Sequence, residues 1–116
     1  MNIFHLTMTA GVAALLAACN QSPAEKQADV VESQADATAE QERIAAEARA
    51  DQMEAQAGAL DTQADVAATP GTEAAIDQQA QTLEEKADAT RAAGEAAADR
   101  IEQKGEAVAD TLRDKD

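Results

Sequence analysis

Few side chains in this 116-residue sequence have the chemistry of an active site or a metal site. The sole histidine is His5 and the sole cysteine is Cys19, so nucleophile–base pairs and metal sites built on these residue types cannot be assembled. The carboxylates of Glu84 and Glu85 need burial to act as a general acid, and the chain has too little apolar bulk to bury them. No glycine-rich phosphate loop or twelve-residue calcium loop occurs in the sequence. We therefore expect no catalytic residue, no bound metal and no cofactor.

The position of Cys19 indicates a modification instead. Residues 6–18 are mostly apolar, and this segment ends in Leu16, Ala17 and Ala18 directly before Cys19. A permanent membrane helix needs about 20 apolar residues, so the run is too short to cross a bilayer but fits the apolar region of a secretory signal. The alternative is a buried apolar helix that happens to end in a cysteine. Because a strongly polar chain follows at once, we expect a signal peptide over the first eighteen residues.

The junction resembles the lipobox of bacterial lipoprotein signal peptides, whose pattern is Leu-Ala/Ser-Gly/Ala-Cys, at all four positions. The resemblance implies that cleavage occurs between Ala18 and Cys19, that the Cys19 sulfur carries a diacylglyceryl group, and that the freed amine can be acylated as well. Two or three acyl chains form a stable membrane anchor, because each buried methylene adds about 0.8 kcal/mol. In Gram-negative lipoproteins an Asp after the cysteine commonly signals inner-membrane retention. Asn20 stands there, which implies the outer membrane, facing the periplasm, rather than the inner membrane.

The composition after Cys19 excludes an ordinary globular core. Hydrophobic residues make up 45% of the sequence, but most of them are alanine and the one aromatic residue, Phe4, lies in the expected signal. The formal net charge is −14, and every Lys, Arg, Asp and Glu follows Cys19. Such a surface is a poor partner for nucleic acid. We interpret the acid excess as a solvated face that keeps the chain soluble, the alternative being a role in binding cations or a basic partner.

Two long helices are the expected elements of the exported part. Ser22, Pro23 and Glu25 have the pattern of a capped helix start after a tether at residues 19–23. The Ala-, Glu- and Gln-rich composition then favours helix over residues 24–68 and 73–116, with a turn at residues 69–72, which read Thr-Pro-Gly-Thr. The fold class predicted is all-α: a long hairpin of two antiparallel Ala-rich helices, with partial disorder as the alternative.

A narrow seam of small apolar side chains is predicted to join the two helices. Apolar positions alternate in steps of four and three, as in helices that pack along one stripe, while Ile44 lies off this line. Because these side chains are small, the seam allows close approach but buries little area. The expected seam comprises Met53, Ala57, Leu60, Ala64 and Ala67 in the first helix and Ile76, Ala80, Leu83, Ala87, Thr90, Gly94, Ala97, Ile101, Gly105, Val108 and Leu112 in the second.

The second segment also carries an eleven-residue repeat. Ala-Asp pairs recur at residues 87–88, 98–99 and 109–110, and eleven residues make three helical turns, so each copy keeps the same face. These copies resemble the late-embryogenesis-abundant proteins of the eleven-residue class and, more loosely, the exchangeable apolipoproteins. The resemblance implies a chain that becomes helical on drying or on lipid. Composition bias alone is the alternative explanation of the repeat.

The predicted function is structural: a lipid-anchored envelope hairpin that acts as a spacer, a scaffold or an interaction module, with a second copy or another envelope protein as partner. The alternatives are a stress-protective conditional helix that coats membranes or client proteins, and an accessory subunit of an envelope complex. The exported part is broadly similar to the small helical lipoproteins of the murein-lipoprotein kind. Those proteins attach to peptidoglycan through a terminal lysine, whereas this sequence reads Arg-Asp-Lys-Asp at residues 113–116, so covalent peptidoglycan linkage is not expected.

Overall fold

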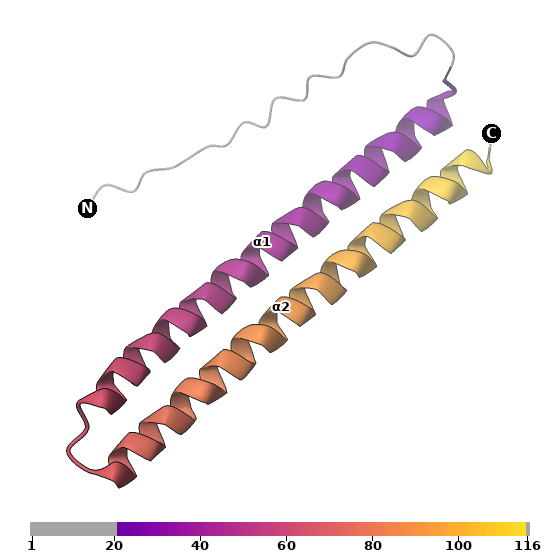
Figure 1. Cartoon of the computed structure of the whole chain (residues 1–116). Coiled ribbons are helices and arrows are strands. Elements are labelled where there is room, and N and C mark those ends of the chain that lie inside the picture. Colours follow the sequence, from indigo (N-terminus) through magenta and orange to yellow (C-terminus); the bar gives the residue numbers. More distant parts are fainter. Residues whose placement is uncertain (1–20, 116) are drawn as a thin grey trace, which may run out of the picture.

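The structure, a computed structural model, describes residues 21–115 and consists there of two long helices. Helix α1 spans Pro23–Asp65 and helix α2 spans Pro70–Arg113. The two helices run antiparallel and stay in contact along their whole length, so that the end of α2 lies beside the start of α1 (Figure 1). The predicted all-α hairpin is therefore confirmed.

The start of α1 follows from its first residues. The Ser22 hydroxyl accepts a hydrogen bond from the Glu25 amide at 3.2 Å, and the Glu25 carboxylate accepts one from the Ser22 amide at 2.9 Å. This capping box satisfies two backbone donors that the helix itself leaves free. Pro23 occupies the first helical position, where its missing amide hydrogen costs nothing.

The chain reverses earlier than the sequence analysis predicts. The turn predicted at residues 69–72 is wrong in its position, because α1 already ends at Asp65 and α2 begins at Pro70. Thr69 caps α2, since its hydroxyl accepts a hydrogen bond from the Thr72 amide at 3.3 Å. Proline and threonine here start a helix rather than form the turn between two helices. The connection is thus residues 66–69, and α2 ends at Arg113 instead of running to residue 116.

Alanine forms the core of the hairpin. Six alanines have no solvent exposure at all, and in each helix they recur every eleven residues. Because eleven residues make three turns, the same stripe of each helix stays against its partner without strong supercoiling. The eleven-residue period therefore governs both arms, and not only the second. The six residues are Ala28, Ala39 and Ala50 in α1 and Ala87, Ala98 and Ala109 in α2.

This period corrects the predicted seam near the end of α2. Val108 is 50% exposed, and Ala109 is buried in its place. Likewise Ala98 is more deeply buried than Ala97. The predicted seam advances in steps of four and three, which is a seven-residue repeat. Over several turns the stripe marked by a seven-residue repeat moves around the helix relative to the stripe marked by an eleven-residue repeat. The remaining predicted seam positions are buried or half-buried, and Ile44 is exposed as predicted.

Glycines set the register and the close approach of the helices. A Cβ on Gly94 would overlap the Cβ of Ala46, and a Cβ on Gly105 would overlap that of Ala35. From Gly94 to Gly105 the contact in α2 advances by eleven residues, and the facing residue in α1 moves back by eleven, from Ala46 to Ala35. One more period in the other direction places Leu83 of α2 opposite Ala57 of α1 in this register.

Neither α1 nor α2 contains an apolar stretch that meets the length and hydropathy of a membrane-spanning helix.

Candidate functional site

The most specific feature of the described residues is a cross-helix ion cluster around Arg43. This arginine of α1 reaches three carboxylates of α2 that lie on successive turns. Its Nη1 donates to Glu102 Oε1 at 2.7 Å, its Nε to Glu95 Oε2 at 3.1 Å, and its Nη2 lies 3.5 Å from Asp99 Oδ1. We call an arginine held in this way an arginine clamp.

A second clamp repeats this geometry in the opposite direction. Arg91 of α2 reaches three carboxylates of α1: Glu54 Oε1 from Nη1 at 2.6 Å, Glu47 Oε2 from Nε at 3.0 Å and Asp51 Oδ1 from Nη2 at 3.3 Å. The nitrogens and the acid types correspond one to one with those around Arg43. The two clamps are therefore equivalent halves of one interaction.

The equivalence has a simple cause in the sequence. Both arms contain the pattern Arg-x3-Glu-x3-Asp-x2-Glu, at residues 43–54 and 91–102. When two helices carrying this pattern pack antiparallel in register, each arginine meets the acids of the other. Ala46 and Gly94 each stand three residues after their arginine and face each other. An approximate two-fold axis therefore passes between them.

A third, shorter clamp joins the end of α2 to the start of α1. Arg113 donates two hydrogen bonds to Glu32, at 2.7 and 3.0 Å, and one to Asp29 at 3.2 Å. Asp29 and Glu32 have the same spacing as the last two acids of the longer clamps. The third clamp fixes the base of the hairpin, close to the expected tether.

Each clamp also shifts the pKa of its arginine and of one glutamate. Hydrogen bonds from the arginines lower the pKa of Glu32, Glu54 and Glu102 below the usual value for glutamate, and the paired carboxylates raise the pKa of each arginine. These three glutamates and the three arginines are therefore ionised at neutral pH. Because the carboxylates remain partly exposed, water and salt screen these pairs, and their main effect is to select the register.

The clamps were not predicted from the sequence, although the sequence contains a signal for them. The eleven-residue period of α2 was predicted, whereas the charge spacing that the two arms share was not. An identical four-residue charge pattern at corresponding places in two antiparallel helices predicts reciprocal ion pairs. That comparison needs no structure.

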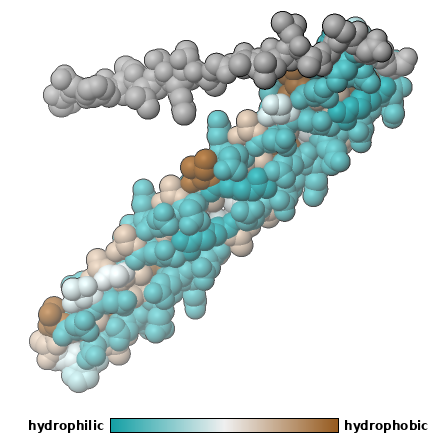
Figure 2. Space-filling view, turned by 45° about the horizontal axis from the view of Figure 1, so that its top comes forward, coloured by the Kyte–Doolittle hydropathy of each residue, from teal (hydrophilic) through white to brown (hydrophobic). Residues whose placement is uncertain are grey.

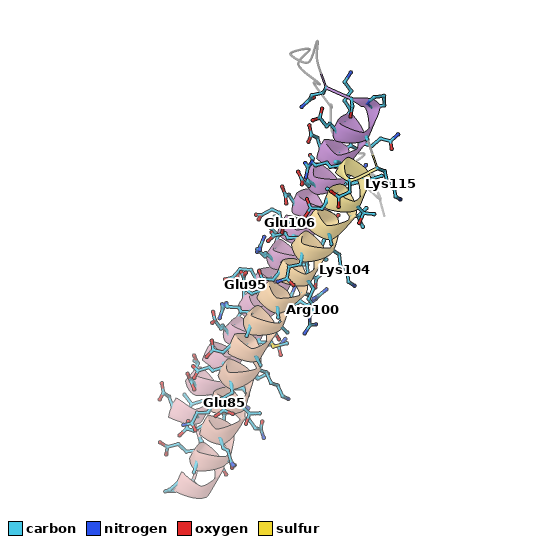
Figure 3. The ribbon with its side chains drawn as sticks, turned by 90° about the vertical axis from the view of Figure 1, so that its right-hand side faces the viewer. Glu85, Glu95, Arg100, Lys104, Glu106 and Lys115 are labelled. Carbon is cyan, nitrogen blue, oxygen red and sulfur yellow. The ribbon has the colours of Figure 1, made fainter. Side chains whose placement is uncertain are left out.

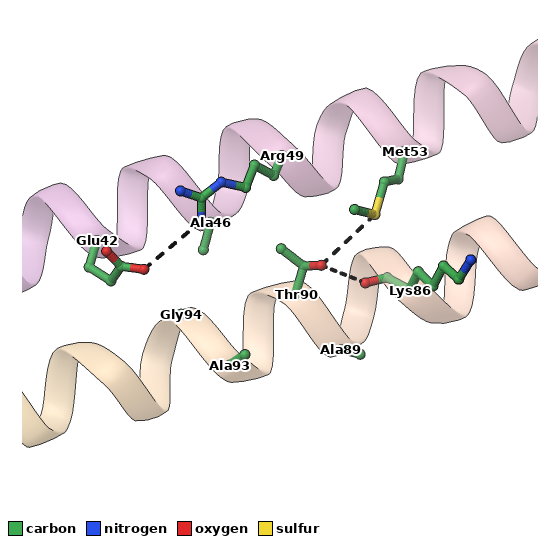
Figure 4. Close-up of a pocket in the computed structure, with 9 residues that line it drawn as sticks. All are labelled: Glu42, Ala46, Arg49, Met53, Lys86, Ala89, Thr90, Ala93 and Gly94. Carbon is green, nitrogen blue, oxygen red and sulfur yellow. Dashed lines mark hydrogen bonds and ion pairs between the residues drawn. The ribbon is translucent and has the colours of Figure 1, made fainter.

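The opposite side of the hairpin has shallow grooves instead of clamps. Ala46, Met53, Thr90 and Gly94 line the central groove, in which the Thr90 hydroxyl donates a hydrogen bond to the backbone oxygen of Lys86 at 2.8 Å (Figure 4). A second groove lies toward the connection, and a third lies at the base of the hairpin. The second is lined by Leu60, Gln79, Thr82, Leu83 and Lys86, and the third by Lys26, Gln27, Val30, Val31 and Leu112.

The predicted modification site lies outside the described residues. Leu16, Ala17, Ala18 and Cys19 all precede residue 21, where the description of the structure begins. The structure does show that ordered helix begins at Pro23, with Ser22 as its cap. A lipid on Cys19 would therefore be joined to the hairpin by only a few residues.

No protein-family model matches the sequence, and no curated protein or solved structure is significantly similar to it.

Proposed function

We propose that this protein is a lipid-anchored helical hairpin of the bacterial cell envelope with a structural or interaction role. The observation that carries the proposal is the complete lipobox at residues 16–19, followed within a few residues by a capped helix. In this arrangement the lipid holds the base of a long, preformed hairpin at the membrane.

The fold supports a structural role over a catalytic one. The described residues form two helices and shallow surface grooves, and the specific polar interactions serve to join the arms. Three clamps distributed along the hairpin hold the arms in one register, so that the molecule presents extended and chemically distinct faces. An extended surface of this kind suits a spacer or a docking module.

Fractionation of the Cys19→Ser variant tests the anchor. We expect the native protein in the membrane fraction with incorporated fatty acid, and the variant without fatty acid label. The matched control is Ser33→Ala, an exposed position within α1, which is expected to leave labelling and fractionation unchanged. Persistent fatty acid labelling of the Cys19→Ser protein would contradict the proposal.

The membrane in which the anchor resides is proposed separately. In a Gram-negative host Asn20 favours transfer to the outer membrane, facing the periplasm. Replacing Asn20 with Asp is expected to move the protein to the inner membrane, as judged by density-gradient separation of the two membranes. If the native protein is found wholly in the inner membrane, this part of the proposal is wrong while the anchor still stands.

A further inference from the structure

The positive charges of this acidic protein are divided between two faces. Of its nine Lys and Arg residues, three form the clamps on one face, which we call the clamp face. The other six belong to the side that carries the grooves. This side we call the basic face, and its cations are Lys26, Arg49, Lys86, Arg100, Lys104 and Lys115.

The eleven-residue period places these cations together. Thr82 and Ala93 line two of the grooves, and the next positions on the same stripe of α2 are Lys104 and Lys115. Arg100 follows Ala89, a groove residue, by the same interval. Viewed along the α2 side, Arg100, Lys104 and Lys115 project to one side of the helix and Glu95 and Glu106 to the other (Figure 3).

The acids of the clamp face do not cancel this charge locally. A helix with its side chains is about 10 Å across, and charges on its two sides are therefore separated by more than the Debye length of about 8 Å at physiological ionic strength. Glu42, which lies 4.0 Å from Arg49, is the acid that enters the central groove. The charges nearest to a negatively charged surface that approaches the basic face are thus mainly positive, despite the net charge of −14.

The apolar content of the basic face is modest. On this face the larger apolar side chains lie in three separate grooves: Met53 in the central groove, Leu60 and Leu83 toward the connection, and Val30, Val31 and Leu112 at the base. The face of the hairpin that Figure 2 shows is mainly hydrophilic, with small, separated hydrophobic patches. Val30 and Val108 are about half exposed, but no continuous apolar stripe is available for deep insertion. Any ligand of this face would therefore be held mainly by its cations rather than by deep apolar insertion.

We propose that the basic face binds the anionic phospholipid headgroups of the bilayer, so that the hairpin lies along the membrane surface beside its anchor. The inference rests on the proposed function for the anchor at Cys19. A second copy is the less favoured occupant, because two basic faces repel each other. Anionic headgroups supply the complementary charge, and each Lys or Arg near such a surface contributes measurably to binding.

Site-specific labels on the lipidated protein test this orientation. Lipid on Cys19 leaves one free thiol in each of the variants Ala93→Cys, in the central groove, and Ala92→Cys, at an exposed position outside it. Fluorophores at these thiols are measured on vesicles of phosphatidylethanolamine with phosphatidylglycerol and on phosphatidylcholine vesicles, both with a headgroup quencher. On anionic vesicles we expect strong quenching at Ala93 and weak quenching at Ala92. On neutral vesicles, and in 1 M salt where the Debye length falls to about 3 Å, the difference is lost.

A charge-matched pair of variants identifies the residues responsible. Quenching at Ala93 on anionic vesicles is expected to be lost in a triple variant that carries Lys86→Gln, Arg100→Gln and Lys104→Gln. The control variant makes the same change in net charge at exposed positions outside the grooves and should retain the quenching. It carries Gln81→Glu, Ala96→Glu and Gln103→Glu.

Three results on vesicles would overturn the inference: equal quenching at Ala92 and Ala93, quenching that does not depend on lipid charge, or equal loss in both variants. Shielding of Ala93 without vesicles, together with dimers in sedimentation, would overturn it in favour of a second copy. If Cys19 carries no lipid, the result differs from a failure of this inference. The fluorophore then also labels the free thiol of Cys19, and the protein does not attach to neutral vesicles.

Discussion

Arg43 and Arg91 occupy equivalent positions on opposite helices, and each is held by two glutamates and one aspartate of the other arm. Corresponding distances agree within a few tenths of an ångström, as in the pairs with Glu102 at 2.7 Å and Glu54 at 2.6 Å. A slip of one helical turn between the arms would separate both sets of pairs at once. The reciprocal clamps therefore specify one register in a seam whose alanines alone would tolerate several.

Gly94 is expected to be required for the close approach at the two-fold axis. Gly94→Ala should gain about 1 kcal/mol in helix propensity but lose more, about 1–3 kcal/mol, because the new Cβ overlaps that of Ala46. Gly58→Ala is the control, since its added Cβ meets no atom within 4 Å. Thermal unfolding followed by circular dichroism should show a lower midpoint for Gly94→Ala and a midpoint several degrees higher for Gly58→Ala. A rise of equal size in both would contradict this packing.

The clamps predict a specific dependence of stability on pH. The folded-state pKa of Glu54 and Glu102 is lowered, so their contribution is present above the pKa of glutamate in the unfolded chain, about 4.3, and is lost as the pH falls through the folded value. The double variant Glu54→Gln, Glu102→Gln should therefore be less stable than the native protein at pH 7. Below about pH 4 the gap between their thermal midpoints should close.

The control for this prediction is Glu84→Gln with Glu85→Gln, which removes the same number of charges outside the three clamps. It separates the clamp effect from the general relief of repulsion on acidification. A gap that is constant with pH, or equal in the control, would show that the clamps do not contribute.

Asp65 marks a place where a fourth clamp is absent. It stands two eleven-residue periods after Arg43, and Glu73 and Asp77 stand the same interval before Glu95 and Asp99. An acid therefore faces acids at the end of α1. Asp65→Arg should raise the midpoint of thermal unfolding by several degrees, because it adds cross-helix pairs and places a cation at a helix C-terminus. The comparison variant Asp65→Asn only removes repulsion, and equal midpoints for the two would contradict the extrapolated register.

The hairpin itself can be measured as a distance. Spin labels at Ala48 and Ala93 lie on neighbouring parts of opposite arms in the hairpin, whereas a continuous helix would separate them by roughly 65 Å. Pulsed electron resonance on monomeric protein should give a short, narrow distance. A single long distance would indicate an open rod, and a broad distribution would indicate disordered arms.

The hairpin could be predicted from local signals in the sequence. The way in which its two arms pair could be predicted only in part. Ser22 marks a helix start by its own chemistry, and the Pro-Gly pair at residues 70–71 indicates that the chain turns nearby. The position of the turn was not predicted, because Pro70 starts α2 instead of lying between the helices. The burial of Ala109 rather than Val108 was not predicted, since seven- and eleven-residue periods differ by little over a few turns. The clamps join side chains of different helices, so they depend on how the two arms are paired. The acid-rich composition does not indicate that pairing, whereas the matching charge pattern at residues 43–54 and 91–102 does.

Intact mass spectrometry of the protein extracted from membranes tests the central claim, that a lipid at Cys19 holds this hairpin to the envelope. The measurement reports the cleavage point and the modification together, independently of any variant. The predicted result is a chain that begins at Cys19 and carries the added mass of two or three acyl chains. A mass equal to the full 116-residue sequence, or a cleaved chain with an unmodified Cys19, would contradict the account.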